Sequence, residues 1–274
     1  MKARLIVTTI VVGGVALAIG GAIALAGKPA STALYPDLRT VVPAHLNLVN
    51  QQQQDILRFS NGIANTGEGP WRMRPEFPPA GTNETQKAIQ EVLASTDSSG
   101  CIVFEAPVSE FEFHEEHNHW HIDDVALFEI RKPDASGAAP DMTEDGVVGG
   151  RSVKTTFCLI DWIRIEGNTN TGVKSDRTYF ECEGAYQGVS VGWIDQYHQA
   201  TEGQQLDVTG VPAGRYFLVS TANPEGVFIE SDGTNNTAWV SFDLKRDGNG
   251  NPKIALVGHS ECEPGLCADN SANR

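Results

Sequence analysis

The sequence predicts an all-β fold: a single antiparallel β-sandwich-like domain with long loops, preceded by an N-terminal hydrophobic helix. Three observations support this class. Runs of β-branched and aromatic residues have the length of strands, Gly, Pro and Asn residues supply turns between them, and helical periodicity is scarce. About 240 of the 274 residues follow the hydrophobic segment, which is enough chain for one such domain.

The N-terminal segment has the composition of a membrane or targeting sequence. Residues 5–27 carry no charge and are flanked by basic residues, and about 20 apolar residues can span a bilayer. Ala24-Leu25-Ala26 also fits a small-x-small cleavage site. We expect residues 1–28 to be either a cleaved signal peptide or an N-terminal membrane anchor and 29–34 to be a linker. In both cases the domain lies outside the cytoplasm, either secreted or held at the membrane.

Strands are expected at Asp55–Gly62, ending in an Asn-Gly turn, at Arg215–Ser220 and at Thr237–Leu244. In the last of these, alternate residues are apolar, as one buried sheet face requires: Ala238, Val240, Phe242 and Leu244. One helix is expected within the domain, over Asn83–Ser95.

The charge balance limits the partners. The chain holds 35 acidic and 20 basic residues, for a formal net charge of −15. Nucleic-acid binding requires a basic surface, so that class is excluded. An acidic surface attracts cations such as amines or lysine-rich chains, although it is equally typical of a soluble exported protein.

Five cysteines in an exported chain favour disulfides. Spacing leaves the connectivity open. We favour Cys262 with Cys267, which lie close together in a polar stretch, and Cys158 with Cys182, which leaves Cys101 over. None of the five falls in a C-x-x-C zinc pattern.

A histidine cluster is the strongest chemical signal. Four of the seven histidines lie within the eight residues His114–His121. His117, His119 and His121 have i, i+2, i+4 spacing, so on a strand all three imidazoles leave from one face. Imidazole suits copper, zinc, iron or nickel, and the cluster therefore predicts a metal site.

Geometry adds a condition to this site. On a flat strand the outer two Cβ atoms would be roughly 13 Å apart, too far for both side chains to bind one ion. If all three histidines bind, the backbone must bend, twist or bulge there. His114 is then either a fourth ligand or a partner that orients the other ligands.

The cluster alone is compatible with other classes of protein. One is an exported copper- or zinc-binding module without redox activity. Another is a cupin-like oxygenase, which would usually need a glutamate and a distant histidine as further ligands. Only His198 and His259 follow the cluster.

His114–His121 resembles the copper-binding signature of the lysyl oxidase family. The resemblance implies that His117, His119 and His121 bind copper (Cu2+), and His114 falls on a further family histidine. It extends over roughly residues 35–262, which it identifies as a lysyl oxidase-like catalytic domain, followed by a polar tail at 263–274.

Two further segments resemble the family's cofactor residues. Val153–Asp161 is similar to the stretch whose lysine enters lysine tyrosylquinone, and it places Lys154 on that lysine. The run through Asp195-Gln196-Tyr197 places Tyr197 on the tyrosine that becomes the quinone. A third segment, Val211–Asn236, follows the family's C-terminal block.

The resemblance implies a copper amine oxidase of the protein-lysine 6-oxidase kind. Such an enzyme uses O2 to oxidise primary amines, including lysine side chains of proteins, to an aldehyde, ammonia and hydrogen peroxide. It needs a base to remove a proton from the substrate carbon. Asp123, Asp124 and His198 are candidates, because they neighbour the ligands or the quinone tyrosine.

The family also implies a structural calcium (Ca2+) site. Residues 230–236 hold carboxylate and amide side chains, the oxygen ligands that calcium prefers. Similar domains complete such a site with an aspartate and a backbone carbonyl near the domain start. The implied ligands here are Asp37, Leu38, Glu230, Asp232, Asn235 and Asn236. A plain Asp-Gly hairpin turn is the alternative.

The chain departs from the family pattern in three places, one of them at His198 and Gln199, which follow Tyr197 where small residues are usual. Glu116 stands where animal members carry a cysteine. The interval from Lys154 to Tyr197, 43 residues, is longer than expected, which suggests an inserted loop around Gly167–Lys174.

Overall fold

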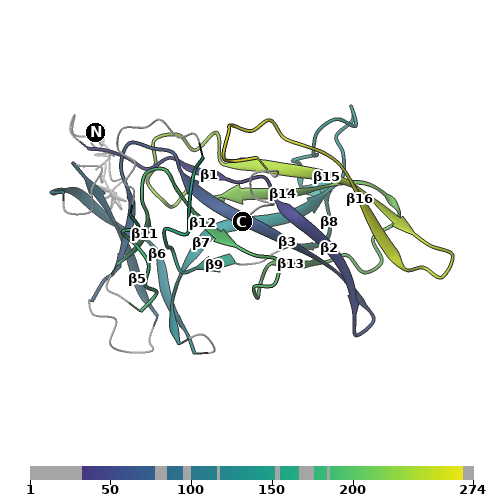
Figure 1. Cartoon of the computed structure of the whole chain (residues 1–274), viewed down its shortest axis with the longest axis horizontal. Helices are drawn as coiled ribbons and strands as arrows, with labels where there is room; N and C mark the ends of the chain where they lie inside the picture. Colours follow the sequence, from purple (N-terminus) through teal and green to yellow (C-terminus); the bar gives the residue numbers. More distant parts are fainter. Residues whose placement is uncertain are drawn as a thin grey trace, which may run out of the picture. The chain divides into compact units, whose positions relative to one another are not determined.

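Antiparallel strand pairing organises the whole of the described chain. The structure is a computed structural model that describes residues 33–77, 85–94, 100–115, 118–151, 155–166, 176–183 and 186–267. All of them belong to one compact unit, Ser31–Arg274. The described elements are strands and one short 3-10 helix (Figure 1), which confirms the predicted all-β class.

The smaller sheet has six strands in the order β1-β3-β12-β10, with β2 and β13 also paired with β3. Its strands are β1 (Leu38–Thr40), β2 (Ala44–Gln51), β3 (Gln54–Asn65), β10 (Ile163–Arg164), β12 (Trp193–Tyr197) and β13 (Gln205–Asp207).

The larger sheet has ten strands in the order β11-β4-β5-β6-β7-β14-β15-β16, with β8 and β9 also paired with β7. The 3-10 helix η1 (Glu144–Gly146) precedes β8. The strands are β4 (Trp71–Pro75), β5 (Gln86–Leu93), β6 (Ile102–His114), β7 (His119–Arg131), β8 (Val147–Arg151), β9 (Thr155–Phe157), β11 (Gln187–Val189), β14 (Gly214–Ala222), β15 (Thr237–Arg246) and β16 (Pro252–His259).

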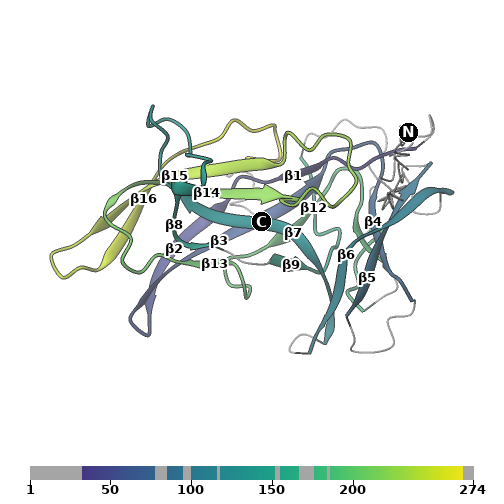
Figure 2. The same ribbon diagram turned by 180° about the vertical axis from the view of Figure 1, so that it is seen from behind.

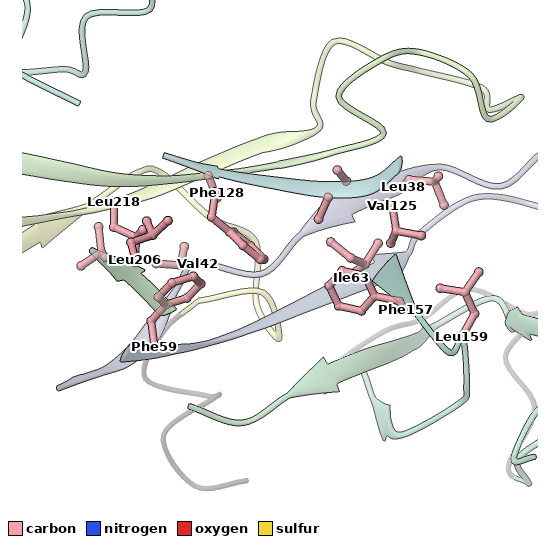
Figure 3. Close-up of a cluster of buried hydrophobic side chains, with 14 of the residues drawn as sticks. Leu38, Val42, Phe59, Ile63, Val125, Phe128, Phe157, Leu159, Leu206 and Leu218 are labelled. Carbon is pink, nitrogen blue, oxygen red and sulfur yellow. The ribbon is translucent and has the colours of Figure 1, made fainter. Parts of the chain in front are cut away.

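The two sheets pack face to face around one apolar core, as in a sandwich. β3 lies in front of β7 and β14 in Figure 1, and the reverse view in Figure 2 shows β7 and β14 in front. The ring of Phe59 from β3 meets the ring of Phe128 from β7 edge-on, with centroids 4.8 Å apart. Figure 3 shows Leu206 and Leu218, again one from each sheet, beside this pair.

The helix expected over Asn83–Ser95 is wrong: its described central part is β5. This strand pairs with β4 on one side and β6 on the other, and it is buried on both faces from Ala88 to Leu93. A strand buried on both faces does not alternate in polarity. The apolar residues Ile89, Val92 and Leu93 then happen to match helical spacing.

Buried polar groups of β5 have specific partners. Gln90 exchanges two hydrogen bonds with the backbone of Ile229, at 2.7 and 2.8 Å. Glu91 forms ion pairs with Arg72 and Arg74, each at 2.9 Å. These long-range contacts, which sequence periodicity does not reveal, decide the conformation of the segment.

The other strand predictions hold with one change of boundary. Arg215–Ser220 lies within β14, and Thr237–Leu244 lies within β15 with its alternate apolar residues buried. The turn expected at Asn61-Gly62 is wrong, because β3 continues to Asn65. β12 packs so closely that a Cβ on Gly62 would lie 2.7 Å from Cγ2 of Ile194, so glycine serves close strand contact here.

Both favoured disulfides are confirmed. Cys158 is bonded to Cys182 and Cys262 to Cys267, and Cys101 is free and exposed. Leu266, inside the second disulfide loop, is buried against the smaller sheet, and its carbonyl accepts a hydrogen bond from Val42.

Among the described residues, no helix has the length and apolar character needed to cross a membrane. Residues 1–28, with the expected signal or anchor helix, lie outside the described part. The same holds for the expected loop insertion at Gly167–Lys174.

Candidate active site

The β6–β7 hairpin positions the described histidines of the cluster. In β7, His119 and His121 leave one face, while Trp120 and Ile122 between and after them enter the core. The Nε2 atoms of His119 and His121 are 2.9 Å apart. Two nitrogen ligands in adjacent positions on one ion, with bonds of about 2.0 Å, lie roughly 3 Å apart. The pair therefore has the spacing of two ligands of one metal ion.

His114 joins this pair from the neighbouring strand. It is the Cα partner of His119 across the ladder, and its ring stacks on that of His121 with centroids 4.1 Å apart. Oγ1 of Thr156 lies 2.9 Å from Nδ1 of His121 and 3.5 Å from Nε2 of His114. The hydroxyl fixes the ring of His121 through one nitrogen and leaves the other directed at His119, as outer partners of metal-binding histidines do.

A turn precedes the first of these two β7 histidines. β7 begins at His119, and Asn118 before it has a left-handed φ of 54°. His117 lies outside the described residues. Among the described residues no group of three or more His, Cys, Asp or Glu side chains is arranged to hold a metal ion. The described part of the predicted copper site thus consists of His119 and His121, with His114 beside them.

Tyr197 ends β12 in the smaller sheet, and its phenol is held by the larger one. The hydroxyl donates to the carbonyl of Cys158 at 2.9 Å and accepts from the N–H of the same residue at 3.0 Å. Its ring meets the ring of Phe157 edge-on, with centroids 4.4 Å apart. Burial raises the pKa of Tyr197 well above its usual value, and the nearby charge of Asp195 acts in the same direction.

The segment around β9 connects the histidines with the tyrosine. Thr156 contacts His121, and Cys158, two residues further on, contacts Tyr197. Lys154 lies outside the described residues, and the described chain resumes at Thr155. The chain that immediately follows Lys154 therefore passes between the histidines and the phenol.

Gln187 links the backbone segments of the same region through hydrogen bonds. It is fully buried, and its Nε2 donates to the carbonyl of Trp120 at 2.7 Å and to that of Cys182 at 3.2 Å. Its Oε1 accepts from the N–H of Leu159 at 3.1 Å. One side chain thus joins the backbone between the two β7 histidines to the backbone beside the tyrosine's partner, Cys158.

The described histidines of the cluster and Tyr197 line one cleft, whose volume is about 740 Å³. Its walls include His114, His119, His121, Thr156 and Tyr197. The charged side chains that line it in the described part of the chain are acidic, namely Glu112, Glu115, Asp195 and Glu202. An acidic, partly enclosed cleft concentrates cations.

The three base candidates from sequence do not line this cleft. His198 is exposed, and its Nδ1 accepts from the N–H of Ala200. Asp124 accepts from the hydroxyl of Ser109, and the carbonyl of Asp123 accepts from the same hydroxyl. The alternation of side chains explains why His198 does not line the cleft, because the residue next to Tyr197 in an extended chain points to the opposite side.

A second cluster of oxygen ligands joins the start and end of the domain. Glu230 accepts from the N–H of Leu38 at 2.9 Å and from the amide of Asn236 at 2.8 Å. The amide of Asn235 donates to the carboxylate of Asp37 at 3.1 Å. Burial is the first cause of a raised pKa at Glu230. The structure therefore brings together five of the six residues implied for calcium, four of them through their side chains and Leu38 through its backbone N–H.

Two oxygens in this second cluster are suited to a hard cation. Oδ1 of Asn235 and Oδ1 of Asn236 are buried and have no hydrogen-bond partner in the described structure, and amide oxygens are typical calcium ligands. Asp232 behaves differently. It is exposed and accepts from the hydroxyl and N–H of Thr234, which lowers its pKa.

Sequence reasoning missed Asp195 and Gln187 at the active site. Asp195 was detectable, because a residue two positions before Tyr197 in a strand shares its face. Gln187 gives no such signal, since its partners are 67 and 28 residues away.

Comparisons with known proteins match this part of the chain. The model of the lysyl oxidase family matches residues 94–249. Human lysyl oxidase homolog 1 is 33% identical over 130 residues, 47% of this chain and 20% of that protein. Human protein-lysine 6-oxidase is 31% identical over 144 residues, 52% of this chain and 30% of that protein. For pig protein-lysine 6-oxidase the identity is 32% over 131 residues, 47% of this chain and 45% of that protein. The chain thus matches less than half the length of each of these relatives.

Proposed function

The chain belongs to the lysyl oxidase family, and from this premise we propose that it is a copper-dependent oxidase of primary amines, among them lysine side chains of proteins. The reaction converts a primary amine, O2 and water to an aldehyde, ammonia and hydrogen peroxide. The observation that carries the proposal is the common cleft of His119, His121 and Tyr197.

Copper would be held by His117, His119 and His121. The 2.9 Å separation of the two described Nε2 atoms fits this role, and so does the hydroxyl of Thr156 at the other nitrogen of His121. Copper supplies one-electron chemistry with O2, which the oxidation of a tyrosine requires and which amino-acid side chains do not supply.

Lysine tyrosylquinone would form from Lys154 and Tyr197. The backbone of Cys158 fixes the phenol of Tyr197 from both sides, so the ring is held in one position in the cleft. Lys154 precedes Cys158 by four residues, a distance that a short extended segment can bridge. The lysine amine must be neutral to add to a quinone ring, and a poorly solvated site favours the neutral form.

Substrate attraction is the role we assign to the acidic walls of the cleft. Glu112, Glu115 and Glu202 line it, and an alkylammonium ion such as a lysine side chain carries the complementary charge. The net charge of −15 acts in the same direction at longer range.

Calcium would be bound by Asp37, Glu230, Asn235 and Asn236, with Leu38 and Asp232 as further members of the implied set. The partnerless amide oxygens of the two asparagines support this assignment. The ion would tie β1 to the segment before β15 and would act on stability rather than on chemistry.

We propose an extracytoplasmic location, with residues 1–28 as signal peptide or membrane anchor. The two disulfides support an oxidising compartment.

The test is peroxide release from copper-loaded, aerated protein given a small primary amine, with and without a hydrazine that traps quinone carbonyls. We expect hydrazine-sensitive peroxide. Intact mass should show a loss of hydrogens from cross-linking, absent in Lys154→Ala and retained in a control, Lys253→Ala, on the exposed strand β16. Copper-loaded protein that releases no peroxide would instead favour an exported copper- or zinc-binding module.

A further inference from the structure

Asp195 is a buried carboxyl group in the wall of the active-site cleft. It precedes Tyr197 by two residues in β12, so both side chains leave the same face of the strand. It is only 1% exposed, whereas the other carboxylates of the cleft, Glu112, Glu115 and Glu202, are exposed or partly exposed. Asp195 is therefore the carboxyl group of the described cleft that is most removed from water.

One oxygen of this carboxyl group has no hydrogen-bond partner among the described residues. The backbone N–H of Ile160 donates to Asp195, while Oδ2 is buried and has no hydrogen-bond partner in the described structure. Buried polar atoms are nearly always paired, so an unpaired one calls for an explanation, and a role in catalysis is one such explanation. An acceptor of this kind, in a cleft wall, is suited to receive a proton.

The neighbouring Asp161 shows what a purely structural carboxylate looks like in this fold. It is fully buried, and its two oxygens accept from the N–H groups of Thr178, Tyr179 and Ser190 and from the hydroxyl of Ser190, at 2.7 to 3.1 Å. It does not line the cleft. Its charge also raises the pKa of Asp195, while one backbone donor, Ile160, and the charge of Arg177 act in the opposite direction.

We propose that Asp195 is the base that removes the proton from the substrate carbon next to the amine nitrogen. This inference rests on the proposed function. The carbon–hydrogen bond would break with its proton going to Oδ2 of Asp195, and the quinone proposed to form at Tyr197 would supply the acceptor for the electron pair of that bond. The proton is released when O2 takes up two electrons and two protons to give hydrogen peroxide.

The surroundings of Asp195 suit this role chemically. Burial and the charge of Asp161 raise its pKa well above the usual value for aspartate, and a carboxylate with a raised pKa is a stronger base. The hydrogen bond from Ile160 keeps the group in one orientation. None of the candidates from sequence, Asp123, Asp124 and His198, lines the cleft.

Asp195→Asn tests the proposal, because it keeps the size and the acceptor for Ile160 but removes the base. Asp124→Asn is the matched control, at a residue with a left-handed φ of 61° that asparagine also adopts. Intact mass and reaction with a hydrazine establish that each variant has formed its cofactor. We expect Asp195→Asn to lower the rate of amine oxidation about 100-fold or more and Asp124→Asn to retain the parent rate.

A second measurement does not depend on the rate of turnover. Infrared difference spectra of the parent protein, taken on anaerobic addition of amine, should show a new band of a protonated carboxyl group. The band should be absent in Asp195→Asn, or displaced in Asp195→Glu if the asparagine variant does not form its cofactor.

The outcomes distinguish a failure of the role of Asp195 from a failure of the oxidase assignment. A mature Asp195→Asn that oxidises amines within a few-fold of the parent would overturn the role of Asp195 and leave the oxidase assignment intact. The absence of a new carboxyl band in an active parent would do the same. A copper-loaded parent that releases no peroxide would remove the oxidase assignment, and the role of Asp195 with it.

Discussion

The hydroxyl of Tyr197 is bonded to the backbone of Cys158 through both of its hydrogen-bonding functions, as donor at 2.9 Å and as acceptor at 3.0 Å. This pair joins the smaller sheet to the segment that follows β9 in the larger sheet. It fixes the ring before any chemistry takes place on it, which is what a site made from the chain's own side chains requires.

Tyr197→Phe should therefore remove both the cofactor and part of the stability. Two backbone groups lose their partner, at a cost of about 1–3 kcal/mol. Tyr216→Phe is the matched control, because the hydroxyl of Tyr216 donates to the carbonyl of Pro212 at 3.0 Å away from the cleft. Intact mass and chemical denaturation should show a lower stability in both variants, with loss of the cross-link in Tyr197→Phe alone. A cross-link that persists in Tyr197→Phe would contradict the assignment of that tyrosine.

Gln187→Leu should weaken copper binding as well as the fold. It breaks the bond to Trp120 that positions the backbone between His119 and His121, and changes at such outer partners typically cost 10–100-fold in metal affinity. Gln90→Leu is the control, since Gln90 is equally buried and also bridges backbone groups, those of Ile229. Competition titration should give weaker copper binding for Gln187→Leu only. Equal affinities in the two variants would show that the bridge is merely structural.

The two disulfides should differ in their effect on the active site. Replacing Cys158 and Cys182 by alanine removes a disulfide between residues 24 positions apart, and it should lower the free energy of unfolding by about 3 kcal/mol. Replacing Cys262 and Cys267, five residues apart, should cost about 2 kcal/mol. Only the first pair borders the cleft, so only its loss should lower the hydrazine-reactive fraction of the protein. Both are measured on protein produced under oxidising conditions, and an equal loss of reactivity in both double variants would contradict the expectation.

Calcium should stabilise the domain through Glu230, more at neutral than at acidic pH. Burial raises the pKa of Glu230. A raised pKa means that the folded state holds the proton more tightly, so this group's effect on stability becomes unfavourable as the pH rises through that pKa. Calcium binds the ionised carboxylate. Above this pKa a bound calcium ion should therefore offset the unfavourable effect of the buried charge on stability, and below it protons compete with calcium for the carboxylate.

The measurement is the melting temperature with calcium and with a chelator. At a calcium concentration 100 times the dissociation constant, the stabilisation would be about 2.7 kcal/mol. Glu230→Gln should lose most of it, whereas the exposed neighbour Glu225→Gln should retain it. A calcium-induced shift of equal size in both variants, or none in the parent at neutral pH, would argue for a plain turn at 230–236.

Part of the fold was predictable because its signals are local. Alternation in Thr237–Leu244 predicts a strand with one buried face, and β15 has it. The two cysteine pairs favoured from the sequence are the pairs that form. β5 was not predictable in this way, because both of its faces are buried and its polar residues find partners far away in sequence, Arg72 and Ile229 among them.

The candidate site was likewise predictable only where its signals are local in the sequence. The i, i+2 spacing of His119 and His121 determines by itself that both rings share a face, since successive side chains of a strand alternate. The sequence also determined that Lys154 and Tyr197 are the residues to test. It did not identify the proposed base. His198 was a candidate because it is next to Tyr197 in the chain, but in the structure its side chain is exposed.

Only the tertiary structure decided which groups meet. It brings Tyr197 from one sheet to Cys158 beside the other, bonds Gln187 to the backbone of the histidine strand, and leaves Oδ2 of the cleft residue Asp195 buried and without a hydrogen-bond partner in the described structure. Burial and long-range contact depend on how two sheets pack, and neither is encoded in the spacing of residues along a single strand. Residue types and local periodicity therefore determined the candidate chemistry, and the packing of the sheets determined the residues that surround it.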